Sequence, residues 1–165
     1  MNKKIIIIGV VAIVAIVALV LILSIGNNNY TDTLSTAQIY NSVADSFSTE
    51  KGVKILDDDV ILEFTDDDLP YLKDYTVVKA NYAKNINEVG IFRVESGKAN
   101  ELKKIIEKYV KETQQIYRAM DYFPEEVEKI DFATVKVFGN YVIYSFLNEK
   151  DTEAFYNAIE NLIKK

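Results

Sequence analysis

The order of hydrophobic patterns along the chain constrains its fold more than any single motif does. Two segments of alternating polarity precede an amphipathic helix, and the same order is found again nearer the C-terminus. Alternation is typical of a half-buried strand, and apolar residues three and four apart are typical of a helix. The expected strands are Thr76–Ala83, Val89–Glu95, Ala133–Phe138 and Tyr141–Leu147, and the expected helices are Leu102–Met120 and a last one capped by Asp151. We therefore predict an α+β fold, with a four-stranded, mostly antiparallel sheet built from two successive ββα units and with its helices packed on one face.

Shorter signals complete this prediction. Apolar residues four apart predict a helix over Leu34–Phe47 that ends near Gly52. Val60–Phe64 has the composition of a short strand, and Pro124 suits the first turn of a short helix because its φ is already fixed near the helical value. The Gly139–Asn140 link places glycine where a type II′ turn needs a positive φ, which predicts a hairpin between the last two strands.

An uncharged, apolar run occupies residues 5–25. A helix of this length is about 30 Å long, which matches the hydrocarbon core of a bilayer. Lys3 and Lys4 precede the run and no basic residue follows it closely, so the positive-inside rule places Met1 in the cytoplasm. The alternative is secretion after signal cleavage near Gly26. We predict three parts: cytoplasmic lysines plus a transmembrane signal-anchor helix (1–26), a polar spacer (27–33) and an extracytoplasmic α+β domain (34–165).

The charge of the chain and its missing residue types exclude several kinds of function. The formal net charge is -6, and an acidic body is poorly suited to bind the phosphate backbone of nucleic acids. The chain has no Cys and no His, which removes disulfides, thiolate nucleophiles, Cys/His zinc sites and Ser-His relays. We predict no cofactor and no nucleic-acid partner. The expected partners are the lipid bilayer, through residues 5–25, and another envelope or membrane protein.

Two acidic triplets, Asp57–Asp59 and Asp66–Asp68, offer the oxygen ligands that Ca²⁺ prefers. Counted from Asp57, an EF-hand loop needs Gly at its sixth position and Glu at its twelfth, where the chain has Leu62 and Asp68. Adjacent side chains of an extended segment also point to opposite faces, so three neighbouring Asp do not chelate together. We interpret both triplets as solvated loops and predict no metal site. A carboxylate-based hydrolase or a Ca²⁺-dependent module stays open as the alternative function.

The 11 tyrosines are the remaining candidates for a binding surface. Tyrosine joins a large rigid ring to a polar tip and is common in protein interfaces. It is also common in strands and at half-buried positions, so most of these residues are expected at the edge of the core. Tyr71, Tyr75 and Tyr122 do not fall on a regular apolar stripe, and we predict that they form the partner surface.

The stretch Tyr122–Phe146 combines a Tyr-x-Pro run, a short acidic helix, a strand and a Gly-Asn-Tyr-Val sequence that opens the next strand. Upstream, Val89–Val94 leads into a long amphipathic helix with two adjacent glutamines, Gln114 and Gln115. Over Asp45–Leu162 the chain thus resembles a family of domains of unknown function, DUF4358. The resemblance implies a small exported or membrane-anchored protein of Gram-positive bacteria, and it brings no activity or catalytic residue. This chain departs from the lipid-anchored members because it has no cysteine, so its anchor is expected to be the helix itself.

These inferences lead to one expected function. We predict a membrane-anchored domain of the bacterial cell envelope, located outside the cytoplasmic membrane. It binds another protein and catalyses nothing, because no residue pattern in the chain supplies a nucleophile with a base.

Overall fold

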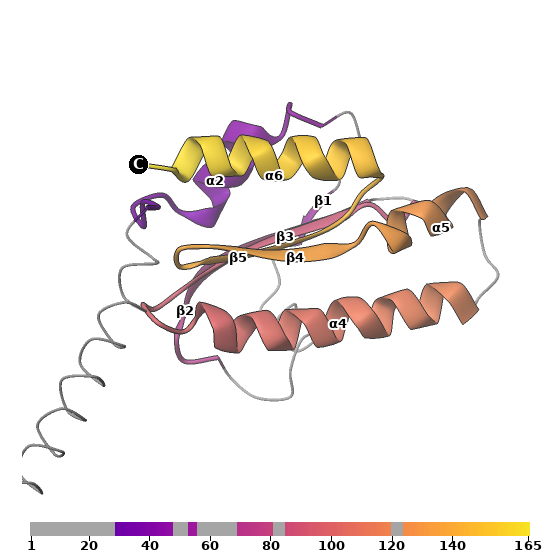
Figure 1. The fold of residues 1–165 in the computed structure, drawn as a ribbon, viewed down its shortest axis with the longest axis horizontal. Coiled ribbons are helices and arrows are strands. Elements are labelled where there is room, and N and C mark those ends of the chain that lie inside the picture. Colours follow the sequence, from indigo (N-terminus) through magenta and orange to yellow (C-terminus); the bar gives the residue numbers. More distant parts are fainter. Residues whose placement is uncertain (1–28, 48–52, 56–68, 81–84, 120–123) are drawn as a thin grey trace, which may run out of the picture.

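The computed structural model describes residues 29–47, 53–55, 69–80, 85–119 and 124–165. Within them, five strands form one sheet in the order β1-β2-β3-β5-β4, and every neighbouring pair is antiparallel. Figure 1 shows α2 and α6 on one side of the sheet and α4 on the other. The strands are β1 (Val53–Ile55), β2 (Leu72–Lys79), β3 (Glu88–Val94), β4 (Thr134–Phe138) and β5 (Tyr141–Phe146). The helices are α2 (Thr36–Val43), α4 (Ala99–Ala119), α5 (Pro124–Asp131) and α6 (Glu149–Ile163).

The predicted α+β class and the four antiparallel strands β2 to β5 are confirmed, with bounds that differ by a few residues. A fifth strand, β1, pairs with β2 and is too short to show a period in the sequence. The prediction that the helices pack on one face is wrong. All positions of β5 are buried, and in β3 Arg93 alone is partly exposed. Central strands buried on both faces need cover on both sides, and the helices supply it.

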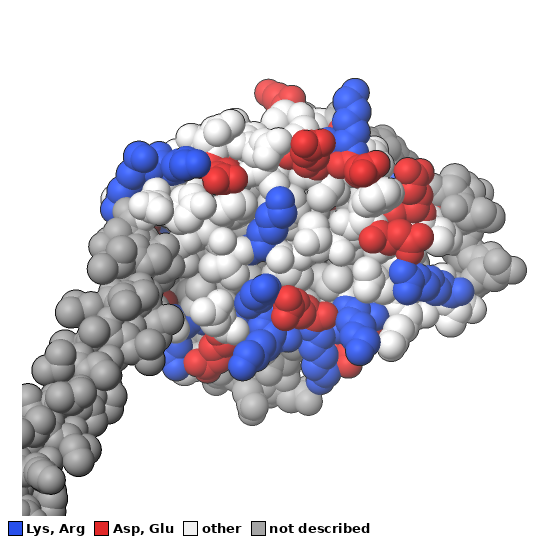
Figure 2. Space-filling view, in the orientation of Figure 1, with Lys and Arg blue, Asp and Glu red and all other residues white. Residues whose placement is uncertain are grey.

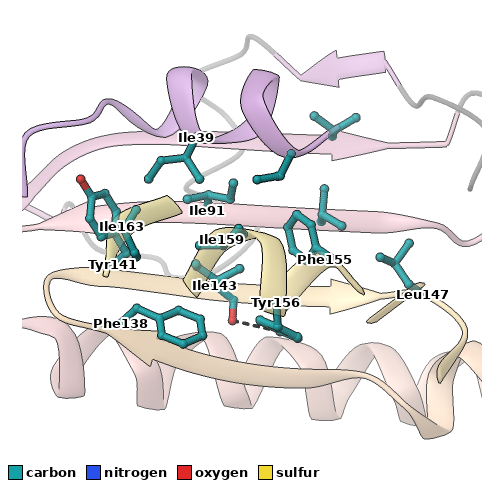
Figure 3. Packing of buried hydrophobic residues seen from close by; sticks show 13 residues of the cluster. Ile39, Ile91, Phe138, Tyr141, Ile143, Leu147, Phe155, Tyr156, Ile159 and Ile163 are labelled. Carbon is teal, nitrogen blue, oxygen red and sulfur yellow. Dashed lines mark hydrogen bonds between the residues drawn. The ribbon is translucent and has the colours of Figure 1, made fainter. Parts of the chain in front are cut away.

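One face of the sheet packs against α2 and α6. Figure 3 shows Ile39 of α2 and Phe155 and Ile159 of α6 beside Ile91 and Ile143 of the two central strands. None of these five side chains is exposed to solvent. Because burial of such a side chain contributes about 2 kcal/mol, this layer is a main source of stability.

The opposite face packs against α4, which is the predicted long helix. Leu102, Ile106 and Val110 recur every four residues on one stripe of α4 and are buried. They belong to one core cluster with Phe92 of β3 and Val142 of β5. Phe92 lies next to Ile91, and Val142 next to Ile143, so the alternation of each strand serves both cores.

A capping box determines where α2 begins. The Ser35 side chain accepts a hydrogen bond from the backbone N–H of Gln38 at 3.2 Å, and the Gln38 side chain accepts one from the Ser35 N–H at 2.8 Å. The helix ends at Val43, earlier than the predicted end near Gly52. The backbone N–H and the hydroxyl of Ser46 both donate to the Val43 carbonyl, so this acceptor is already used where the helix stops.

The last helix, α6, has Asn148 as its N-cap rather than the predicted Asp151. The Asn148 side chain accepts a hydrogen bond from the backbone N–H of Asp151 at 2.9 Å. Asp151 lies three residues further on, where its carboxylate accepts from the Asn148 amide at 2.9 Å. A negative charge in the first turn is favourable there because of the helix dipole.

The predicted hairpin between β4 and β5 is confirmed. Phe138 and Tyr141 are direct partners on either side of the two-residue link. Gly139 has a φ of 60°, in the left-handed region that glycine adopts without strain. The turn therefore fixes the register of the two strands.

Among the described residues, no helix is both long and apolar enough to cross a membrane. The predicted transmembrane segment, residues 5–25, lies outside the described residues, and so does the predicted strand Val60–Phe64. The fold presented above is built without either segment.

Candidate functional site

Glu88, the first residue of β3, directs a carboxylate toward α4. Alternate residues of a strand share a face, and Phe92 and Val94 of β3 pack in the core under α4. Glu88 lies in step with them and is 9% exposed. Its direct partner across the sheet is Lys79 of β2. A charge so deeply buried is stable only if other groups compensate it.

Three side chains surround the Glu88 carboxylate. The Tyr109 hydroxyl, on α4, donates a hydrogen bond to Oε1 at 2.8 Å, and the Tyr144 hydroxyl, on β5, donates to the same oxygen. Nζ of Lys79 lies 3.5 Å from Oε2 and 3.5 Å from the Tyr109 hydroxyl. We name Glu88, Lys79, Tyr109 and Tyr144 the Glu88 cluster.

Gly90 makes room for the tyrosine of β5. Gly90 and Tyr144 are direct partners across β3 and β5, and a Cβ on Gly90 would lie 2.1 Å from a carbon of the Tyr144 ring. The ring lies between those of Tyr109 and Phe92, at centroid distances of 5.6 Å and 6.1 Å. The side chain missing at Gly90 thus allows the Tyr144 hydroxyl to reach Glu88.

The Glu88 cluster holds a charge more readily than it moves a proton. Two hydroxyl donors and a lysine converge on one carboxylate, and such donors favour its ionised form as an acceptor. A general base must instead offer a lone pair to a substrate. Oε1 is already shared by two protein hydroxyls, so the arrangement is suited to fixing the geometry around it.

A small polar hollow of about 160 Å³ opens beside this cluster. Tyr117 of α4 forms part of its wall. Its side chain is half-buried, and its hydroxyl makes no hydrogen bond with the part of the chain that the structure describes. Burial raises the pKa of Tyr117, and the negative charges of Glu88 and Glu126 add to this effect while Lys79 opposes it. The polar hollow is lined by Lys79, Ala80, Asn85, Ile86, Asn87, Glu88 and Tyr117.

The loop that enters β3 is fixed by both neighbours. The backbone N–H of Asn87 donates to the Asn85 side chain at 2.9 Å, and the Ala80 N–H donates to the Asn87 carbonyl at 2.8 Å. The backbone N–H of Ile86 donates to Glu126 of α5 at 3.0 Å, and Lys129 holds the same carboxylate at 2.7 Å. The rim of the polar hollow is therefore preorganised by α5.

One polar atom at the polar hollow is not satisfied by the described residues. Asn87 is 7% exposed, and its Oδ1 is buried without a hydrogen-bond partner. A buried acceptor left unpaired costs about 1–3 kcal/mol, and such exceptions often mark a place where another molecule supplies the partner. The site thus has a structural reason to receive a hydrogen-bond donor.

The size and lining of the polar hollow limit what it can hold. Pockets for drug-sized ligands and cofactors have volumes of about 300–1,000 Å³, well above the value here. Within the described residues, no three Asp or Glu side chains come together as ligands for a metal ion. The geometry fits one side chain or a similarly small polar group.

The residues predicted for a partner surface are not brought together at this site. Tyr71 is 8% exposed in the core cluster under α4, with Nζ of Lys98 5.2 Å from its ring centre, and burial raises the pKa of Tyr71. Tyr75 is half-buried and stacks on Phe92 at 6.1 Å. Tyr122 lies outside the described residues, as do the triplets Asp57–Asp59 and Asp66–Asp68.

The sequence-based search missed the residues that do form the site. Glu88 and Lys79 stand at inward-facing strand positions, where a charge is unusual, and this was the available signal. Tyr109 and Tyr117 were assigned only to the apolar stripe of the long helix. Asn87 carries no signal in the sequence, because nothing there shows that its amide becomes buried.

Comparison with known proteins gives one result. The model of the family "Domain of unknown function (DUF4358)" matches residues 61–147, which is more than half of the chain. No curated protein and no solved structure matches. The match includes the two central strands β3 and β5, α4 and most of the polar hollow. The chain therefore belongs to the DUF4358 family.

Proposed function

We propose that this protein is a membrane-anchored, non-catalytic binding module of the bacterial cell envelope. Residues 5–25 cross the cytoplasmic membrane, and the α+β domain lies outside, where its polar hollow receives a side chain of another envelope protein. The observation that carries this proposal is the buried, unpaired Oδ1 of Asn87 beside a small preformed hollow. A donor from a partner would satisfy what the described residues leave open.

The surroundings of the polar hollow favour a protein as the partner. Ile116 directly precedes Tyr117 on α4 and is 56% exposed. Exposed apolar side chains next to a pocket for one anchoring side chain are typical of protein interfaces. The hollow itself holds about as much as one such anchor, while a larger ligand would need a larger pocket.

A binding role also fits the chemistry of the chain better than catalysis does. The chain contains neither His nor Cys, so a nucleophile activated by either one is not available within it. The buried carboxylate at the site is held by Tyr109, Tyr144 and Lys79. These groups support a rigid wall, and rigid walls improve affinity because less freedom is lost on binding.

Site-specific photo-crosslinking on intact cells tests the proposal. Ile116 and Leu162 are exposed large apolar residues on different helices, so a photoreactive residue at Leu162 is a matched control for one at Ile116. We expect a discrete crosslinked partner from Ile116 and not from Leu162. The crosslink should decrease in Tyr117→Phe, which removes only a hydroxyl at the polar hollow.

Two outcomes would contradict the proposal. Identical crosslinking patterns at Ile116 and Leu162 would show contact without a specific site, and an unchanged crosslink in Tyr117→Phe would place the partner elsewhere. Membrane attachment is measured separately, by alkaline extraction of the same cells. Release of the protein into the soluble fraction would remove the anchor from the proposal.

A further inference from the structure

The segment 29–35, which we name the N-terminal strap, is tied to the end of α6. The backbone N–H of Thr31 donates to the Ile163 carbonyl at 2.8 Å, and the Lys165 N–H donates to the Asn29 carbonyl at 2.9 Å. Tyr30 and Lys164 form an isolated antiparallel bridge between them. The strap thus extends the last residues of the chain by β-type pairing.

Side chains fasten the N-terminal strap to the sheet as well. Asp32 lies 3.1 Å from Nζ of Lys73 and accepts a hydrogen bond from the Asn140 amide at 3.0 Å. Arg93 donates to the Asp32 carbonyl at 3.3 Å, and the Tyr141 hydroxyl donates to the Leu34 carbonyl at 2.7 Å. β2, β3 and the β4–β5 hairpin therefore all contact the strap.

Tyr30 adds an apolar contact to these polar ones. Its ring meets Phe138 edge-on at 5.6 Å, and its Cβ would be 3.0 Å from a side chain placed at Gly139. Its hydroxyl lies 3.4 Å from Glu160 of α6. With polar and apolar contacts on both sides, the N-terminal strap is a rigid part of the domain and not a loose tether.

The strap and the polar hollow lie at opposite ends of the sheet. The strap contacts Arg93, near the last residue of β3, whereas the hollow is lined by Glu88, the first one. At about 3.4 Å per residue, β3 separates the two ends by about 20 Å. Figure 1 shows the C-terminus and the β4–β5 turn at one end of the sheet, and α5 at the other.

We infer that the N-terminal strap orients the domain on the membrane, with the β4–β5 hairpin end next to the lipid and the polar hollow facing away from it. This inference rests on the proposed anchor at residues 5–25. From Ile25 to Asn29 the chain spans at most about 14 Å however it is arranged. The strap end therefore stays near the bilayer surface, and the hollow meets a protein in the surrounding aqueous space.

The charge distribution agrees with this orientation. Figure 2 shows acidic side chains gathered toward the end of the molecule where α6 begins, on the face in view. Glu149 and Glu153 are exposed residues of that part of α6, whereas Lys164 and Lys165 lie at its other end, beside the strap. Bacterial lipid surfaces that carry negative charge attract lysines and repel carboxylates.

Quenching from the membrane surface tests the inference with the full chain. The chain has no cysteine, so Ser96→Cys and Ala119→Cys each give a single labelling site. Both residues are exposed and flank the two ends of α4, about 30 Å apart. The labelled proteins are inserted into phosphatidylcholine–phosphatidylglycerol vesicles that carry a quencher on the lipid headgroup. We expect quenching at Ser96→Cys at least about twofold stronger than at Ala119→Cys, because the latter label is farther from the surface.

A strap variant separates orientation from attachment. In Tyr30→Ala/Asp32→Ala the strap loses its ring contact and its ion pair, and the difference between the two labels should shrink. Equal quenching in vesicle-bound protein with an intact strap, or stronger quenching at Ala119→Cys, would overturn the orientation and leave the anchor standing. Protein that does not float with the vesicles would contradict the proposed function instead. Circular dichroism verifies that each variant is folded.

Discussion

Strands β2 and β3 carry one cross-strand ion pair near each end. Asp74 faces Arg93 at the strap end, and Lys79 faces Glu88 at the polar hollow. In the first pair Nε of Arg93 donates to Asp74 at 2.7 Å, while in the second the charged atoms are 3.5 Å apart. The same strands and the same kind of pair therefore produce a tight contact at one end and a looser one at the other.

The neighbours of each pair explain the difference. Asp74 also accepts a hydrogen bond from the Thr36 backbone N–H at 2.7 Å, which links the pair to the first turn of α2. Arg93 reaches the N-terminal strap, so every part of this network joins two elements of the fold. Glu88 instead fixes two tyrosines beside a hollow where the Asn87 oxygen has no described partner. One end closes the fold, and the other is available for a ligand.

The largest effect is expected at the buried acid. Glu88→Ala leaves the hydroxyls of Tyr109 and Tyr144 without their acceptor and Lys79 without its counter-charge. Removing one partner of a buried ion pair costs about 3 kcal/mol, and the melting temperature should fall by about 10 °C. Glu88→Gln keeps one acceptor oxygen and should lose less. The measurement is urea unfolding of the full chain in detergent, followed by circular dichroism; equal losses in the two variants would show that hydrogen bonding there contributes little.

A smaller loss is expected at the strap end. Asp74→Ala removes the acceptor for the Thr36 N–H and the partner of Arg93, and both ionic side chains are partly exposed to solvent. We expect a loss of about 2 kcal/mol, chiefly from the helix cap and the charged hydrogen bond. Asp74→Asn keeps the cap and is the matched control. If the Ala and Asn variants unfold at the same urea concentration, the cap is not what stabilises this end.

Most of the sheet was predictable because its signals are local. The alternation in β2 and β3, the stripe on α4 and the Gly139–Asn140 turn are all contained in short windows. The prediction of helices on one face failed at Tyr141–Phe146, where apolar and aromatic residues follow one another almost without interruption. Such a run indicates burial on both faces, and it was interpreted as a strand with only one.

The site was not predictable in the same way, because its parts are distant in the sequence. Glu88 is 21 residues from Tyr109 and 56 from Tyr144, and no motif has that spacing. The tyrosines chosen from the sequence, Tyr71 and Tyr75, were selected for irregular placement. Tyr71 proved to belong to the core, since a large ring off the stripe of one element can still pack against another.

Alkaline pH should destabilise the fold through its buried tyrosines. Burial raises the pKa of Tyr156 and of Tyr141 near the strap. In the unfolded chain these groups lose their protons near pH 10, so above that pH the folded state binds more protons and stability falls as pH rises. Each such tyrosine contributes a slope of up to about 1.4 kcal/mol per pH unit. Urea unfolding between pH 8 and pH 11, compared for Tyr156→Phe and the unchanged chain, measures this slope; a variant with the same slope would show that Tyr156 ionises freely.

The smallest effect separates the two hydroxyls of α4. Tyr109→Phe removes a hydrogen bond of 2.8 Å to Glu88 and should cost about 1 kcal/mol. Tyr117→Phe removes a hydroxyl that has no hydrogen bond within the described residues, so we expect a change of less than about 0.5 kcal/mol. The same variant should weaken the crosslink at Ile116, because the lost hydroxyl lines the polar hollow. A Tyr117→Phe protein as destabilised as Tyr109→Phe would show that the hollow end, like the strap end, serves to hold the fold together. The comparison between the two ion pairs would then no longer distinguish a binding site from a structural contact.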